Sequence, residues 1–157
     1  MLVAIDEAEK AGLRDEVPVG AAVYDHEHGH IVAKAGNNVR SLNDPTAHAE
    51  ILVIREACKK IGQSRLTFFS LYVTLEPCPM CCQAISFARL PKLVFGAYDT
   101  KGGGVEHGPK IFSHPTSHHY LEILGGIEEQ RCGELLTDFF NKKRQEGNSL
   151  KKNLNKS

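Results

Sequence analysis

A strand–helix–strand pattern between residues 68 and 98 determines the architecture that we expect for this chain. Residues 68–75 are a short apolar run that contains Val, Tyr and Thr, which is typical of a buried strand. A helix is predicted to begin at Pro79 and to end before Pro91, because proline is favoured at a helix start and stops a helix. Residues 92–98 are predicted to be a second strand. Because the joints are short, the two strands should be parallel neighbours in one sheet.

The remaining segments extend this unit into a layered domain. Strands are predicted at residues 17–24, 31–35 and 121–127, the first two joined as a hairpin. Helices are predicted at residues 3–14, 44–61 and 128–145. The second helix is expected to have Asp44 as its N-cap and Pro45 at its first position. The third is expected to turn Phe139 and Phe140 inward. Residues 99–119 contain three consecutive glycines and should form a long functional loop. The predicted fold class is α/β, a three-layer α/β/α domain on a central mixed sheet of about five strands.

The length and charge of the chain suit a single domain with a basic end. The chain has 157 residues and no formal net charge, which excludes a uniformly basic coat for nucleic acids. Residues 141–157 nevertheless hold six Lys or Arg and a single acid. We therefore predict a domain over residues 1–146 and a basic tail over residues 147–157, and the sequence leaves the order of the tail open. The basic segment is either a solvated helix end or a contact for a polyanion.

Cysteine usage and hydropathy favour the cytoplasm. The number of cysteines is five, which is odd, and Cys81 and Cys82 are adjacent, so a disulfide framework is not expected. The N-terminus has acidic residues directly after a short apolar run and does not resemble a signal peptide. No apolar run approaches the ~20 residues that a membrane helix needs. We expect a cytoplasmic protein without a membrane partner.

Two short motifs carry the chemistry of this chain. Cys78 and Cys81, three residues apart at the start of the predicted helix, lie on nearly the same side and can bind one metal ion. His48 begins a His-Ala-Glu motif near the start of the preceding helix and would supply a third ligand. Three protein ligands and an open fourth position are typical of catalytic zinc, so one Zn²⁺ per chain is predicted. Glu50 can then serve as a proton carrier, provided that His48 lies at the very start of its helix, where the geometry is irregular.

Other residues offer alternative interpretations of these motifs. A Cys-x-x-Cys pair by itself is also found in redox sites and among buried thiols. Cys82 competes as a ligand, but its spacing from Cys78 lacks the pattern, so we interpret it as a buried thiol near the site. Cys58 and Cys132 fall on apolar helix faces and are expected in the core. Three histidines alternate in the turn at residues 26–30, which we interpret as a solvated loop and not as a metal site.

The two motifs together resemble the His-x-Glu and Pro-Cys-x-x-Cys signature of the zinc-dependent deaminases of the cytidine/deoxycytidylate deaminase superfamily. Within it, the chain is similar to the bacterial tRNA adenosine deaminase family over about residues 3–146. Five segments carry this resemblance in the same order: residues 16–21, 44–50, 74–81, 95–99 and 138–140. The resemblance implies a homodimer that hydrolyses the wobble adenosine of a tRNA anticodon to inosine, with zinc-activated water and Glu50 as the catalytic acid and base.

The resemblance also implies a set of residues that bind the substrate. Asn37 matches the residue that binds the base, although Asn38 follows at once and could take its place. Val19 matches an apolar pocket position, and Asp99 matches a position that contacts the RNA next to the target. His114 and Phe140 match positions near the anticodon loop.

Two other functions remain open at this point. A deaminase of a free base or nucleotide, such as guanine or cytosine, would use the same zinc ligands. A zinc-stabilised module without activity would show a fourth protein ligand and no use for Glu50. The basic segment and the aromatic pair at residues 139–140 favour RNA, because single-stranded loops are held by phosphate contacts and by stacking on aromatic rings.

Overall fold

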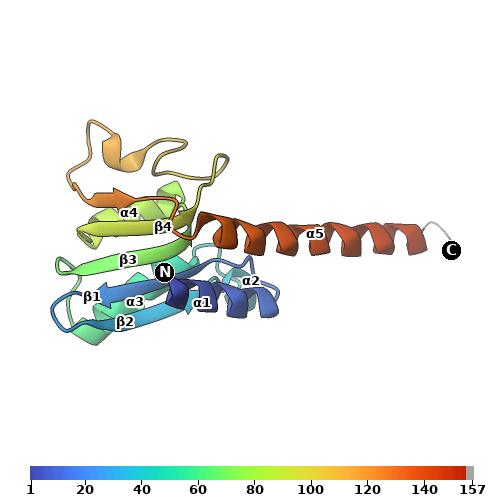
Figure 1. Cartoon of the computed structure of the whole chain (residues 1–157), viewed down its shortest axis with the longest axis horizontal. Helices are drawn as coiled ribbons and strands as arrows, with labels where there is room; N and C mark the ends of the chain where they lie inside the picture. Colours follow the sequence, from blue (N-terminus) through green and yellow to red (C-terminus); the bar gives the residue numbers. More distant parts are fainter. Residues whose placement is uncertain (155–157) are drawn as a thin grey trace.

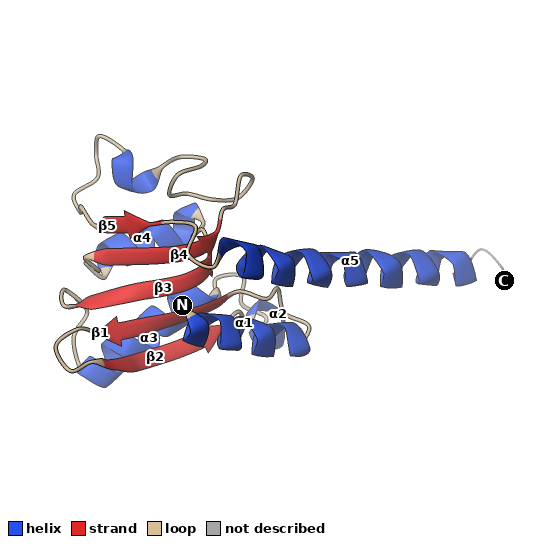
Figure 2. Cartoon of the chain, in the orientation of Figure 1, coloured by secondary structure: helices blue, strands red, loops and turns tan. Residues whose placement is uncertain are grey.

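A five-stranded mixed sheet forms the centre of the computed structural model, which describes residues 1–154, with side chains up to Ser149 (Figure 2). The strands, in chain order, are β1 (Gly20–Asp25), β2 (His30–Gly36), β3 (Phe69–Leu75), β4 (Lys92–Ala97) and β5 (Glu122–Leu124). Their order across the sheet is β2-β1-β3-β4-β5. β1 pairs antiparallel with β2 and β3, whereas β3, β4 and β5 run parallel. The predicted hairpin and the predicted parallel strand–helix–strand unit are therefore confirmed.

Helices cover both faces of the sheet (Figure 1). In chain order they are α1 (Leu2–Leu13), α2 (Val39–Leu42), α3 (Ala49–Ile61), α4 (Pro79–Phe87), the short 3-10 helix η1 (Ile111–Ser113) and α5 (Glu129–Leu154). α1 and α5 lie on one face, and α3 and α4 lie on the other. This arrangement confirms the three-layer α/β/α fold. Within the described residues, none of these helices combines the length and the apolar character that a membrane span requires.

The core lies between these layers and explains the apolar runs of the central strands. Leu71 and Val73 of β3 and Leu93 and Phe95 of β4 are all completely buried. α1 lies so close to β1 that a Cβ atom on Gly20 would be only 2.0 Å from the carbonyl oxygen of Ala4. The sheet and the first helix are therefore packed at backbone contact.

The start of α3 differs from the prediction. Asp44 does not cap the helix, since its carboxylate accepts hydrogen bonds from the backbone N–H and the hydroxyl of Thr46, at 2.8 and 2.7 Å. These bonds form a local turn that competes with helix formation. The helix begins at Ala49, and His48 is its N-cap with an extended backbone, at φ −71° and ψ 152°. His48 thus occupies the irregular position that its pairing with Glu50 requires.

The last two elements also differ from the prediction. β5 is only three residues long, since the chain turns at Gly125 and Gly126, the latter with φ +79°. α5 continues to Leu154, so the domain boundary predicted at residue 146 falls inside this helix, while residues 155–157 lie outside the described residues. Beyond its contact with the sheet, α5 extends away from the body of the protein (Figure 1).

Candidate metal and active site

A cavity of about 420 Å³ lies where the carboxyl ends of β3 and β4 meet the first turns of α3 and α4. Its size is typical of pockets for small ligands or single bases. Crevices at the carboxyl ends of parallel strands are the usual ligand sites of α/β folds. Six of the residues predicted to bind metal, to bind substrate or to act in catalysis line this cavity: Val19, Asn37, His48, Glu50, Cys78 and Asp99.

Two cavity residues and the buried Cys81 beside them form a group that fits a metal ion. The ligand atoms of His48, Cys78 and Cys81 all lie within 4.8 Å of one another. The Sγ atoms of Cys78 and Cys81 are 3.6 and 3.5 Å from Nδ1 of His48. In a tetrahedral zinc site with ordinary bond lengths, sulfur and nitrogen ligands are about 3.5 Å apart. The donor set and its spacing therefore fit Zn²⁺.

The local structure explains why these residues meet. Cys78 is the N-cap of α4 with an extended backbone, Pro79 is its first helical residue, and Cys81 lies one turn on. His48 has the same N-cap position on α3. Two helix N-termini thus point at the site, and their positive ends favour the thiolates that bind metal.

The two thiols have pKa values that are shifted in opposite directions. Hydrogen bonds from Cys81 and His48 lower the pKa of Cys78 to about 4, which favours its thiolate form. The hydrogen bond with that thiolate, followed by burial, raises the pKa of Cys81. A cation among the three ligands would favour the thiolate form of both cysteines.

No fourth protein ligand joins the group within the described part of the chain. Cys82 is completely buried, and its Sγ donates to the carbonyl oxygen of Pro77 at 3.4 Å. The interpretation of Cys82 as a buried thiol near the site is therefore confirmed. The histidine turn at residues 26–30 is exposed and contributes no metal group. Three protein ligands are the number found in catalytic zinc sites, whereas structural zinc sites almost always have four.

Glu50 lies beside the metal group, on the first turn of α3. Its side chain lines the cavity although the residue is only 4% exposed. Burial raises the pKa of Glu50 to about 7. A carboxyl group whose pKa is near the working pH can both accept and release a proton during a reaction.

Asn37 lines the cavity, whereas its neighbour Asn38 does not. Oδ1 of Asn37 accepts the backbone N–H of Ala49 at 2.8 Å. This bond ties the amide to the start of α3 and leaves its NH2 group as a donor for a ligand. Val19 supplies an apolar wall and is 5% exposed.

Two residues of the predicted substrate set lie outside the cavity. His114 is exposed and lines a separate surface pocket beside α4. Phe140 is 46% exposed, which contradicts its predicted inward orientation, whereas its neighbour Phe139 lines the cavity. Consecutive helix residues point about 100° apart, so only one ring of the pair can face the site.

Glu76 is a cavity residue that the sequence did not predict. It is 2% exposed, and its Oε1 accepts the backbone N–H groups of Val105, Glu106 and His107, at 3.2, 2.8 and 3.0 Å. Its Oε2 accepts the N–H of Asp99 at 3.0 Å and Nδ1 of His107 at 2.7 Å. A charged residue directly after an apolar strand was the only sign of this role in the sequence. Glu76 thus fixes the loop that carries Asp99 against the turn that carries Cys78.

Substitution of Glu76 by Gln is expected to lower the free energy of unfolding by about 2–4 kcal/mol at pH 7, because an amide cannot accept all of these bonds. Burial opposes ionisation of Glu76, but the hydrogen bonds from His107, Glu106 and Asp99 lower its pKa below the usual value. The stabilisation that ionised Glu76 gives to the folded state is present above its unfolded pKa of about 4.3. It is lost as the pH falls through the lower pKa of the folded state. Urea unfolding between pH 3 and 7 measures both effects.

The control for this prediction is Glu106→Gln, since Glu106 is exposed in the same loop. It should leave the free energy of unfolding unchanged. A Glu76→Gln protein as stable as the parent at pH 7 would show that the loop does not depend on this carboxylate.

The fold and the site together define a class of protein. A three-layer α/β/α domain that places His48, Cys78 and Cys81 at two helix starts, with Glu50 beside an open cavity, has the layout of the zinc-dependent deaminases.

Comparison with known proteins narrows this class. A family model described as the cytidine and deoxycytidylate deaminase zinc-binding region matches residues 1–97. A tRNA-specific adenosine deaminase of Agrobacterium fabrum (strain C58 / ATCC 33970) is 54% identical over 145 residues, which cover 92% of this chain and 93% of that protein. The chain therefore belongs to the cytidine and deoxycytidylate deaminase family, holds one zinc ion, and is an enzyme.

Two solved structures are also similar. One, from work on A-to-I editing by tRNA:A34 deaminases at the wobble position, has a TM-score of 0.84 and 53% identity, covering 87% of this chain and 97% of that one. The other is a guanine deaminase of Bacillus subtilis with a TM-score of 0.58 and 34% identity, covering 76% of this chain and 78% of that one. The similarity to the tRNA:A34 deaminase structure therefore has the higher TM-score of the two and covers more of both chains.

Proposed function

We propose that this protein deaminates the wobble adenosine of a tRNA anticodon to inosine. The observation that carries the proposal is the 54% identity to a tRNA-specific adenosine deaminase over 92% of this chain. The cavity, which holds the metal group and Glu50 and has the volume for one base, supports it. A tRNA substrate would place the protein in the cytoplasm.

The residues around the cavity suit hydrolytic deamination. The chemistry that zinc supplies when bound is the activation of a water molecule as a nucleophile near neutral pH. Glu50 accepts a proton from that water and delivers it to N1 of the adenine ring, and then carries a proton to the departing amine. Adenosine and water thereby give inosine and ammonia. Burial of Glu50 keeps bulk water from competing for these protons.

The substrate-binding roles follow from the positions of the other residues. The NH2 group of Asn37 donates to the base, and Val19 packs against its face. Asp99 contacts the RNA strand beside the target nucleotide. His114 and Phe140 lie outside the cavity, so they would contact the anticodon loop only away from the target base.

The test is incubation with an anticodon stem-loop that carries adenosine at the wobble position, beside free adenosine, guanine and cytidine. We expect inosine from the stem-loop and no turnover of the three free compounds, with inosine measured by mass spectrometry. A stem-loop with guanosine at the wobble position is the matched control. Turnover of guanine without conversion of the stem-loop would replace this function by that of a free-base deaminase, as the likeness to a guanine deaminase allows.

We also propose that the protein is a homodimer. Large apolar side chains are exposed on α4 and in the segment before β5: Met80 at 36% and Phe87 at 73% on the helix, and Tyr120 at 84% in that segment. A second copy would cover such a surface. Light scattering at micromolar concentration should give about twice the chain mass of 17.3 kDa, and a monomer would contradict the proposal.

A further inference from the structure

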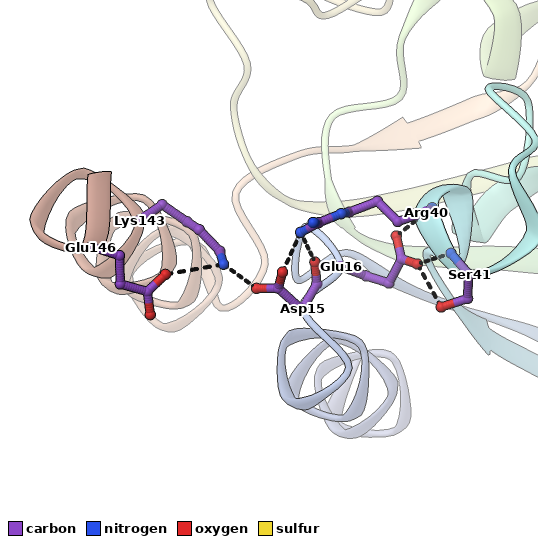
Figure 3. Close-up of polar contacts among 6 residues, drawn as sticks. All are labelled: Asp15, Glu16, Arg40, Ser41, Lys143 and Glu146. Carbon is purple, nitrogen blue, oxygen red and sulfur yellow. Dashed lines mark hydrogen bonds and ion pairs between the residues drawn. The ribbon is translucent and has the colours of Figure 1, made fainter. Parts of the chain in front are cut away.

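Three charged residues from separate elements meet at the wall of the cavity (Figure 3). Asp15 follows α1, Arg40 lies in α2 and Lys143 lies in α5. The carboxylate of Asp15 forms ion pairs with both the Arg40 guanidinium and the Lys143 ammonium group. Arg40 also donates to the backbone oxygen of Asp15 at 3.0 Å, and Lys143 lies 3.2 Å from the carboxylate of Glu146.

This cluster belongs to the cavity and is open to solvent. Asp15, Arg40 and Lys143 line the same cavity as His48 and Glu50. Their side chains are 47%, 64% and 35% exposed. Exposed ion pairs of this kind add little to stability, so an anionic ligand can compete with Asp15 for the two cations.

The position of Arg40 is fixed from beneath by Glu16, which is 1% exposed. The carboxylate of Glu16 accepts the backbone N–H of Arg40 at 3.1 Å, and the N–H and hydroxyl of Ser41 at 2.8 and 2.9 Å (Figure 3). The backbone of Arg40 is therefore anchored, while its guanidinium group remains at the cavity wall. The fixed backbone keeps the Arg40 side chain within reach of the cavity, and its planar guanidinium group suits an anion with two oxygens.

We propose that Arg40 and Lys143 form a binding site for a backbone phosphate of the RNA beside the target nucleotide, and that Asp15 occupies this site in the free protein. The inference rests on the proposed function. A phosphodiester carries a full negative charge and two oxygens, which suit a guanidinium fork and an ammonium group. When the target base enters the cavity, the phosphate displaces the Asp15 carboxylate from both cations.

The presence of Asp15 in the proposed phosphate site affects ligands that carry a phosphate and not those that lack one. Asp15 offsets one of the two positive charges until a ligand supplies both a phosphate here and a base in the cavity. Free bases, which have no phosphate, gain nothing from the site. Asp15 should therefore weaken the binding of every phosphate-bearing ligand, the stem-loop included.

Asp15→Asn tests the proposal, because Asn removes the charge and tolerates the left-handed backbone of Asp15, at φ +63°. For the anticodon stem-loop we expect KM to fall about threefold to tenfold with kcat unchanged, as expected for loss of one like charge near a phosphate. If Asp15 only fastens α5 to the body, KM will rise instead. An unchanged KM would also overturn the proposal.

Lys143→Gln provides the second variant. It should raise KM and reduce the slope of log KM against log salt concentration by about 0.7, the value for one phosphate contact on a single strand. In the double variant with Asp15→Asn, the gain from Asp15→Asn should shrink, since the two residues act at one site. A gain that stays full-sized in the double variant would contradict the shared site.

Lys142→Gln is the matched control, because Lys142 is exposed on α5 and does not line the cavity. Its effects on KM and on the slope of log KM against log salt concentration should each be less than half of those of Lys143→Gln. The parent protein separates the two levels of failure. If it does not convert the stem-loop, the proposed function and the phosphate site both fall; if it does, and Asp15→Asn does not lower KM, only the phosphate site falls.

Discussion

Substitution of Glu50 by Gln is expected to lower kcat by about 10²–10⁴-fold and to leave zinc content and stability unchanged. Gln has the shape of Glu but cannot carry a proton between water, the ring nitrogen and the amine. Glu50 is not one of the three ligand residues, so the metal should stay in place. The measurement is single-turnover conversion of the stem-loop, together with metal analysis and urea unfolding.

Glu56→Gln is a matched control on the same helix. Glu56 is exposed and pairs with Lys60 at 3.3 Å, outside the cavity. Its substitution should leave the rate unchanged. A Glu50→Gln protein that retains zinc and turns over within about threefold of the parent would remove Glu50 from the mechanism.

Substitution of Cys81 by Ala is expected to abolish stable zinc binding and, with it, activity. The remaining ligands, His48 and Cys78, cannot hold zinc as three ligands do, and loss of a thiolate removes one of the two negative charges at the site. Metal analysis after extensive dialysis measures the zinc content of each variant.

The adjacent cysteine gives a close control for this substitution. Cys82→Ala removes a thiol that is equally buried, but it points to the carbonyl oxygen of Pro77 and not to the metal group. It should keep a full equivalent of zinc and lose only some stability. If Cys81→Ala retained zinc while Cys82→Ala lost it, the ligand assignment would be wrong.

Local patterns in the sequence predict most of the framework of this site. The apolar run at residues 68–75, the proline at residue 79 and the second run at residues 92–98 predict a parallel pair of strands and the helix between them. That unit alone places Cys78 and Cys81 at a helix start beside the carboxyl end of a strand. These features are predictable because they depend on residues close together in the chain.

Contacts between distant segments were not predictable in this way. Glu76 holds a loop that begins more than twenty residues further on, and Asp15 meets Lys143 from the opposite end of the chain. Neither pairing leaves a periodic pattern. The predicted start of α3 at residue 44 was wrong because Asp44 and Thr46 form a turn. Such a turn uses the same residue types as a helix cap.

The exposure of Phe140 has a related cause. Helical periodicity marks the apolar stripe of α5, but it does not show where the helix leaves the body of the protein (Figure 1). Cys132 is buried against the sheet, whereas Phe139 lies at the cavity and Phe140 is half exposed. The end of the packed region is set by the size of the sheet and not by the sequence of the helix.

The position of inosine in a full-length tRNA transcript with adenosine at the wobble position tests the proposed activity most directly. The transcript is incubated with the zinc-loaded protein, digested and sequenced by mass spectrometry. We predict inosine at the wobble position alone, formed by the parent protein and by Cys82→Ala but not by Glu50→Gln or Cys81→Ala. Adenosine left intact at the wobble position by the zinc-loaded parent protein, or inosine formed equally by Glu50→Gln, would contradict the account.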